Sequence, residues 1–227
     1  MKECRLLLFT KVPQLGCVKT RMNPFLTEQQ SVQLHIALTQ HIATMMSDWP
    51  YGTVQLHYAV HELESLNQKR PGNFLSALGA GLNLQLQPQL DGDLGAKMAA
   101  AVISNLDDEK YCDGVILLGA DCPFLTQKHC CELRDILSAG YQAALIPAHD
   151  GGYVALALNC YDRKIFSDID WGSDRVLQQT IAVLQDLGWC YQLLPALADI
   201  DRPEDLAQLK HLESASLQAF SHTADES

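Results

Sequence analysis

Short apolar runs alternate with longer segments of helical periodicity along the chain, and this alternation limits the fold more than any other feature of the sequence. Apolar runs typical of strands occupy residues 5–10, 54–60, 82–87, 114–118, 143–148, 153–158 and 189–194. Helical spacing is found in residues 27–46, 61–70, 93–106, 126–140 and 173–187, and a proline at 203 begins a last helix. Strands that alternate with helices predict a mostly parallel sheet covered on both faces. We therefore expect a three-layer α/β/α domain over residues 1–212 and a polar tail over residues 213–227.

Composition narrows the class of protein. Hydrophobic residues make up 48% of the 227, enough for a substantial core, and the formal net charge of −11 opposes binding to nucleic acid. Apolar runs stay well short of the ~20 residues that span a bilayer, and RLLLFT is too short for the apolar part of a signal sequence. Eight cysteines occur without a CxxC pair, which is typical of a reducing compartment. We expect a cytoplasmic protein with neither membrane nor nucleic-acid partners.

The segment after the first strand, KVPQLGCVKTR, is rich in cations. Lys11, Lys19 and Arg21 surround a glycine, Gly16, and a hydroxyl, Thr20. Ligands of open α/β sheets bind beyond the carboxyl ends of the strands, and phosphate oxygens need cations and free N–H donors. The segment therefore fits a phosphate-binding loop, with a solvated basic loop as the alternative. The patterns of a Walker P-loop and of a Rossmann GxGxxG are absent.

Carboxylates follow two of the predicted strands. Asp121 comes directly after the apolar run in GVILLGADCP, and LADIDRPEDL holds Asp199 and Asp201 before the last helix. A carboxylate at a strand end can coordinate a divalent cation that bridges phosphate oxygens. The alternatives are a turn residue for Asp121 and an N-cap for Asp201.

A third candidate is the turn PAHDGGYVAL. Its composition at Asp150, Gly151 and Gly152 is that of a β-hairpin, while two glycines also let the backbone approach a ligand closely.

Taken together, these motifs resemble a bacterial family of transferases. This is the DUF2064 family, or radical-SAM/selenodomain-associated transferase 1, which is similar in fold to nucleotide-diphospho-sugar transferases of GT-A type and to molybdenum-cofactor guanylyltransferases. The resemblance covers roughly residues 5–210 and is carried by FTKVPQLGCVKTR, GDLGAKMAAA, LLGADCPFL, PAHDGGYVAL, DWGSDRVL and DIDRPEDL, in that order. It implies a GT-A fold.

The resemblance also implies site residues. Asp121 and Asp201 would hold a metal ion. A nucleotide-binding set would comprise Lys11, Gly16, Lys19, Thr20, Arg21 and Asp93. An acceptor-side set would comprise Asp150, Gly151, Gly152, Tyr153 and Trp171.

Three functions are compatible with these residues. The first is Mg²⁺- or Mn²⁺-dependent glycosyl transfer from a nucleotide-sugar to a small-molecule acceptor, with Asp121, Asp150 and Lys19 as catalytic residues. The second is nucleotidyl transfer from a nucleoside triphosphate, with release of pyrophosphate. The third is a non-catalytic nucleotide-binding module, since one fold hosts many roles.

Overall fold

A single seven-stranded sheet forms the centre of the computed structural model, which describes residues 3–59, 74–76, 78, 81–107 and 112–221. Its order is β3-β2-β1-β4-β6-β5-β7. Only β6 runs antiparallel to its neighbours among the strands described, and the predicted mostly parallel α/β fold is confirmed. The strands are β1 (Glu3–Lys11), β2 (Val54–Ala59), β3 (Gln85–Pro88), β4 (Cys112–Gly119), β5 (Ala143–Pro147), β6 (Tyr153–Leu158) and β7 (Tyr191–Leu193).

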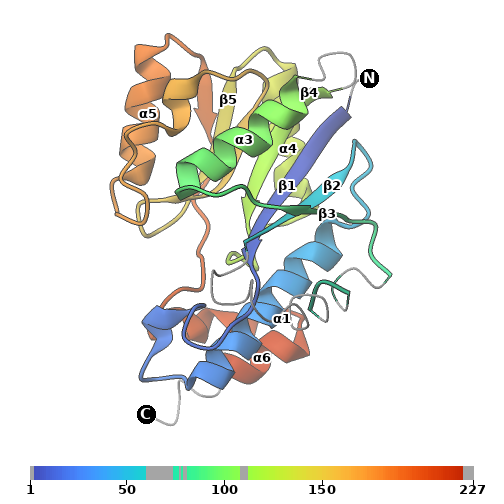
Figure 1. Cartoon of the computed structure of the whole chain (residues 1–227), viewed down its shortest axis with the longest axis vertical. Helices are drawn as coiled ribbons and strands as arrows, with labels where there is room; N and C mark the ends of the chain where they lie inside the picture. Colours follow the sequence, from blue (N-terminus) through green and yellow to red (C-terminus); the bar gives the residue numbers. More distant parts are fainter. Residues whose placement is uncertain (1–2, 60–73, 77, 79–80, 108–111, 222–227) are drawn as a thin grey trace.

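Helices surround this sheet. In Figure 1, α3 and α5 lie in front of it, α4 lies behind it, and α1 and α6 lie below, beyond the carboxyl ends of the parallel strands. The helices are α1 (Glu28–Met46), α3 (Leu94–Leu106), α4 (Gln127–Ser138), α5 (Val176–Asp186) and α6 (Ala215–Ser221), with 3₁₀ turns η1 (Thr20–Met22), η3 (Arg163–Phe166) and η4 (Pro203–His211).

Local caps fix where two of the helices begin. Thr27 caps α1, because its hydroxyl accepts from the backbone N–H of Gln30 at 3.2 Å while the Gln30 side chain accepts from the Thr27 N–H. Asp93 caps α3 by accepting from the N–H of Ala96 at 2.8 Å. Both starts agree with the helices predicted from residues 27 and 93.

The alternation of side chains along β1 divides the core. Leu6 and Leu8 point to the face covered by α4 and the second half of α1, whereas Leu7 points to the face covered by α3, η3 and α5. All three leucines have no exposed surface. A buried strand of this kind needs apolar residues on both faces, which explains why RLLLFT is continuously apolar rather than alternating.

A third apolar cluster lies below the sheet and corrects one prediction. Leu217 in α6 is fully buried there with Leu34 and Leu38 of α1 and with residues of η4. The prediction of a polar tail from residue 213 is therefore wrong for residues 215–221, which fold as α6. The helix predicted at Pro203 is present, as the 3₁₀ turn η4.

Smaller differences concern the edges of the sheet. The strand predicted at 82–87 is shorter, at 85–88, and it lies at the sheet edge. The predicted helix at 61–70 and turn at 71–72 lie outside the described residues. The described chain contains no helix of the length and apolarity that crossing a membrane requires.

Candidate functional site

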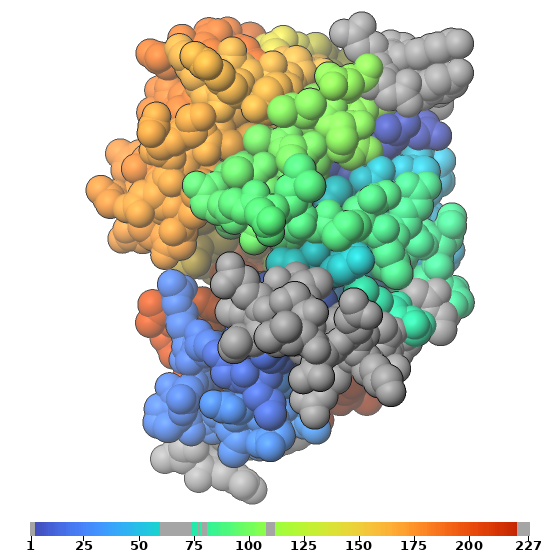
Figure 2. Space-filling view, viewed as in Figure 1, coloured from blue at the N-terminus to red at the C-terminus, as the bar shows by residue number. Residues whose placement is uncertain are grey.

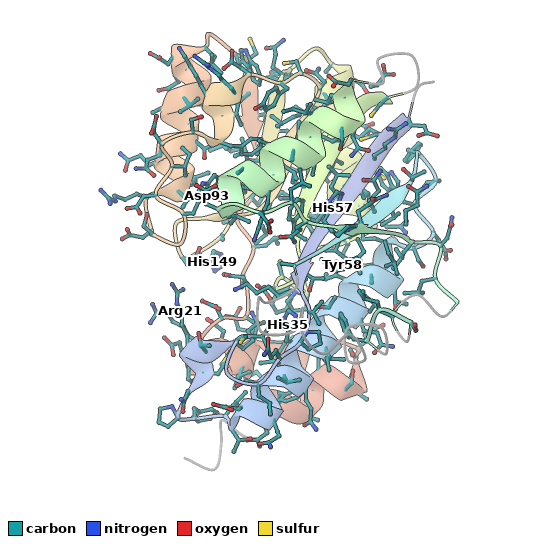
Figure 3. All side chains as sticks on the ribbon, viewed as in Figure 1. Arg21, His35, His57, Tyr58, Asp93 and His149 are labelled. Carbon is teal, nitrogen blue, oxygen red and sulfur yellow. The ribbon has the colours of Figure 1, made fainter. Side chains whose placement is uncertain are left out.

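A cavity of about 240 Å³ opens beyond the carboxyl ends of β1 and β4. In Figure 3, Arg21 lies in the lower part of the molecule, and Asp93 and His149 lie above it, at the lower end of the part that contains the sheet. On the visible face in Figure 2, the orange residues of the upper part meet the blue N-terminal residues at a notch in the outline. The cavity is lined by Phe9, Arg21, Leu94, Met98, Leu117, Leu118, Gly119, Asp121, Cys122, Ala148, Asp150, Gly152, Tyr153, Val154, Trp171, Gly172, Ser173, Val176 and Asp199.

Asp121 and Lys19 form an ion pair beside this cavity. The Lys19 ammonium lies 2.8 Å from Asp121 Oδ1, and only 3% of the Lys19 side chain is exposed. Half of the Asp121 side chain is exposed, and since Oδ1 is buried, the exposed oxygen is Oδ2. Sequence reasoning predicted that both residues belong to one site, and the structure brings them together.

The segment that holds Asp201 docks against the same place. Ile200 donates its N–H to the Asp121 carbonyl at 2.9 Å, and its own carbonyl accepts from Lys19 Nζ at 2.5 Å. Asp201 Oδ1 lies 3.8 Å from Lys19 Nζ, and Asp201 Oδ2 lies 2.7 Å from Arg21 Nη1. Asp201 is not the N-cap of η4, because Arg202 occupies that position, and the Arg202 N–H donates to Asp205 Oδ2 at 2.7 Å.

Electrostatics keep the Asp121 carboxylate charged. Burial raises the pKa of Asp121, but the Lys19 ammonium and, to a smaller extent, His35 and Lys11 outweigh it and hold the pKa below its ordinary value. An ionised carboxylate with one free oxygen at the cavity wall is the donor that a hard divalent cation prefers.

Asp199 is a cavity-lining carboxylate that was noted in the sequence but not placed in the predicted site. Burial, together with the negative charge of Asp150 and then that of Asp201, raises the pKa of Asp199 to about 6. Asp121, Asp150 and Asp199 all line the cavity, and Arg21 is the one cation among the described lining residues. This excess of negative charge favours a ligand that arrives with a cation.

Tyr153 and Trp171 form an aromatic wall of the cavity. Trp171 packs edge-on against Tyr153, with ring centroids 6.5 Å apart, and lies 6.4 Å from the ring of Phe166. Gly95 makes this packing possible, because a Cβ there would lie 2.5 Å from the Phe166 carbonyl and 2.6 Å from Trp171 Nε1. Gly95, the second glycine of GDLG, thus leaves the space in which Trp171 packs.

The turn between β5 and β6 presents Asp150 to the cavity. The predicted hairpin is confirmed, since β5 and β6 pair antiparallel and the Gly152 N–H donates to Asp150 Oδ1 at 2.9 Å. Gly151 has φ +92 and accepts at its carbonyl from the N–H of Leu177, 2.9 Å away. The turn is thus a hairpin that also lines the cavity, and the predicted approach of a ligand to its backbone stays a prediction.

Several predicted residues do not line the cavity. Lys11 at the end of β1, Gly16 on the loop after it and Thr20 at the start of η1 are exposed, and Asp93 is exposed with its carboxylate engaged in the α3 cap. Gly151 and Asp201 lie just behind the lining residues, at the contacts described above. Their predicted roles toward a nucleotide stay predictions.

The cavity residues that sequence reasoning missed are mostly apolar. Phe9, Leu94 and Met98 form a wall next to Trp171. The ring of Phe9 is stacked on that of His57, with centroids 5.0 Å apart and planes 6° apart. The position of Phe9 at the end of β1 was the available signal, since residues at strand ends face ligands in such sheets.

Comparison of sequences identifies related proteins. The chain matches, over residues 26–173, the model of the family described as "Uncharacterized protein conserved in bacteria (DUF2064)". No curated protein matches its sequence.

Solved structures show the same fold. A proposed nucleotide-diphospho-sugar transferase from Desulfovibrio desulfuricans G20 has a TM-score of 0.82 and 24% identity, covering 100% of this chain and 95% of the other. A cytidylyltransferase from Leptospira borgpetersenii serovar Hardjo-bovis (strain JB197) has a TM-score of 0.54 and 11% identity, covering 100% and 94%. A 4-diphosphocytidyl-2C-methyl-D-erythritol synthase from Anaerococcus prevotii DSM 20548 has a TM-score of 0.52 and 9% identity, covering 98% and 96%. At these identities the likeness establishes the fold alone.

Proposed function

Because the chain belongs to the DUF2064 family and has the nucleotide-diphospho-sugar transferase fold, we propose that it is an enzyme that transfers a glycosyl group from a nucleotide-activated sugar to a small-molecule acceptor. One observation carries the proposal. A charged strand-end carboxylate, Asp121, and an exposed cation, Arg21, line one cavity, with a third charged group, Asp150, on the opposite turn. This arrangement provides a place for a diphosphate and a separate place for an acceptor.

A divalent cation, Mg²⁺ or Mn²⁺, is part of the proposal. Asp121 fits it, with an ionised carboxylate and a free oxygen at the cavity. Both oxygens of Asp201 already face cations, so Asp199, which lines the cavity beside two other carboxylates, fits as a second ligand better than the predicted Asp201. Substrate phosphates and water would complete the ligands of an ion held by one or two carboxylates.

The residues divide the reaction between them. A bound ion would neutralise negative charge on the departing nucleoside diphosphate. Arg21 would bind the phosphate oxygens through two N–H groups along one edge of its guanidinium. As the bond between the anomeric carbon and the diphosphate oxygen breaks and the bond to the acceptor oxygen forms, Asp150 would take the proton of the acceptor hydroxyl. The aromatic wall at Trp171 would exclude water from the transfer.

Nucleotidyl transfer is the second candidate. It is favoured by the likeness of fold to the cytidylyltransferase and to the 4-diphosphocytidyl-2C-methyl-D-erythritol synthase. Here the phosphate of a substrate would attack the α-phosphorus of a nucleoside triphosphate, and pyrophosphate would leave. A phosphate nucleophile is already ionised, so Asp150 would orient the substrate rather than accept a proton.

Product analysis distinguishes the candidates. The protein is incubated with Mn²⁺ and a panel of nucleotide-sugars and nucleoside triphosphates, together with sugar, alcohol and phosphate acceptors. Nucleoside diphosphate indicates glycosyl transfer, pyrophosphate indicates nucleotidyl transfer, and binding without turnover indicates a non-catalytic module.

The Asp121→Asn variant tests the role of the strand-end carboxylate. Loss of one electrostatic stabiliser costs about 2–4 kcal/mol of barrier, so kcat/KM should fall about 30- to 1000-fold. Asp186→Asn, at an exposed position in α5 that does not line the cavity, is the matched control and should keep wild-type activity. Full metal-dependent turnover by Asp121→Asn would refute the assignment.

A further inference from the structure

We propose that Lys19 is a positioning residue, which holds the Asp121 carboxylate and the 199–201 segment in place and leaves contact with the substrate phosphates to Arg21. The inference rests on the proposed function for its catalytic consequence, although the positioning itself is a property of the free protein. It changes the role predicted for Lys19, which was direct binding of the nucleotide phosphates.

The Lys19 ammonium is held by buried contacts away from the cavity. An ammonium has three N–H groups. The Ile200 carbonyl at 2.5 Å and Asp121 Oδ1 at 2.8 Å lie within hydrogen-bond distance of Nζ, and Asp201 Oδ1 at 3.8 Å adds an ion-pair contact. With 3% of its side chain exposed, Lys19 is absent from the cavity wall. A phosphate could reach Nζ only if one of these contacts opened.

The backbone aims the side chain inward. Lys19 has φ +49, a left-handed conformation that is uncommon for a residue with a Cβ, and it ends the loop from Gly16 just before η1. Its carbonyl then accepts from the N–H of Met22 at 3.0 Å. The conformation turns the Lys19 side chain under the loop, toward β4, rather than out into solvent.

The effect of this contact falls on Asp121. The Asp121 carbonyl accepts from the Ile200 N–H, and Asp121 Oδ1 faces the Lys19 ammonium. Because Lys19 also donates to the Ile200 carbonyl, it contacts both residues of the hydrogen bond that joins the segment after β4 to the 199–201 segment. Asp121 and Asp201 both face this ammonium. Without the Lys19 ammonium the two carboxylates repel each other, and the Asp121 carboxylate no longer has a fixed orientation toward the cavity.

Arg21 differs from Lys19 in the features that matter for phosphate binding. Its side chain is 48% exposed and lines the cavity. It donates to Asp201 Oδ2 at 2.7 Å and more weakly to the Gly172 carbonyl at 3.4 Å. One edge of the guanidinium can therefore turn to a phosphate while the other stays with Asp201. The two cations of the loop thus have separate tasks.

Hydrogen–deuterium exchange tests the positioning in the free protein. In Lys19→Gln the peptide that contains Ile200 should exchange at least tenfold faster than in the wild type, whereas in Arg21→Gln it should change less than threefold. Equal exchange in Lys19→Gln and the wild type would overturn the proposal, whatever the substrate is.

Pyrophosphate binding in buffer that contains Mg²⁺, measured by calorimetry, tests the division of tasks. Arg21→Gln should weaken binding at least tenfold and Lys19→Gln less than threefold, and an equal loss in both would overturn the proposal. With an active substrate pair, Lys19→Gln should lower kcat while leaving KM for the nucleotide unchanged. Wild-type protein that neither binds pyrophosphate nor turns over would defeat the proposed function, and the exchange experiment would still decide the role of Lys19.

A double variant keeps the test valid if Lys19→Gln alone folds poorly. Asp121→Asn with Lys19→Gln removes both charges of the pair. A residue that acts through Asp121 adds no further loss, so the double variant should match Asp121→Asn alone in kcat/KM. An additional loss of tenfold or more would show that Lys19 contacts the substrate itself.

Discussion

Replacing Gly151 by alanine should damage the fold through one identifiable contact. An added Cβ would lie 2.1 Å from the Asp174 carbonyl oxygen and 2.7 Å from its carbon, and both are backbone atoms that cannot turn aside. The turn is also bonded to α5 through the Leu177 N–H, so it cannot retreat without losing that bond. We expect the two segments to be forced apart at the edge of the cavity.

The magnitude has two parts. Gly151 has φ +92, and a left-handed backbone costs a residue with a Cβ about 1–2 kcal/mol. Overpacking against the Asp174 backbone adds about 1–3 kcal/mol. The sum is about 2–5 kcal/mol, and in a chain of this size each kcal/mol lowers Tm by about 2–4 °C.

Gly172→Ala supplies the matched control. Gly172 has φ +86, but a Cβ there would meet nothing within 4 Å, so this variant carries the backbone cost without the contact. Urea unfolding followed by circular dichroism gives the free energy of unfolding of both variants and of the wild type. We expect Gly151→Ala to be less stable than Gly172→Ala by about 1–3 kcal/mol. Two variants of equal stability would refute the close approach of the turn to residue 174.

Two further predictions concern stability. The pKa of Asp199 in the folded protein is raised to about 6, so the protein loses stability as pH rises through this value and the side chain becomes charged. Asp199→Asn should therefore stabilise the metal-free protein by about 1–2 kcal/mol at pH 8 and hardly at pH 4. An equal gain at both pH values in urea titrations would contradict this prediction. Leu217→Ala removes a fully buried side chain of α6 and should lower the free energy of unfolding by about 2–4 kcal/mol. Ser216→Ala, at an exposed position of the same helix, is the control and should change it by less than about 0.5 kcal/mol. Similar values for the two variants would mean that α6 does not dock as described.

The sequence predicted the fold well where its signals are local. Periodicity located the strands and the main helices, including the starts of α1 and α3. Asp93 was assigned to the nucleoside on the strength of the resemblance, although its place before a helical run already indicated a cap. The α6 segment was missed because seven residues give too short a pattern to detect.

The site was predicted in part, for a physical reason. Asp121, Asp150 and Tyr153 line the cavity because strand ends and the turn beside them deliver side chains to one edge of the sheet, while Trp171 comes from the segment between η3 and α5. The task of Lys19 could not be predicted, because the direction of its side chain depends on a positive φ and on a carbonyl 181 positions later in the chain. The apolar residues of the cavity carry no motif.

The docking of the 199–201 segment sets the moment in protein synthesis at which the site becomes complete. Lys19 is made 181 residues before Ile200, whose carbonyl accepts from its ammonium, and the Asp201 carboxylate that bonds Arg21 follows Ile200. N-terminal parts of a chain fold first as it is made, so a nascent chain has its sheet before it has its finished cavity. A chain released before residue 199 carries the loop cations without the oxygens that arrange them.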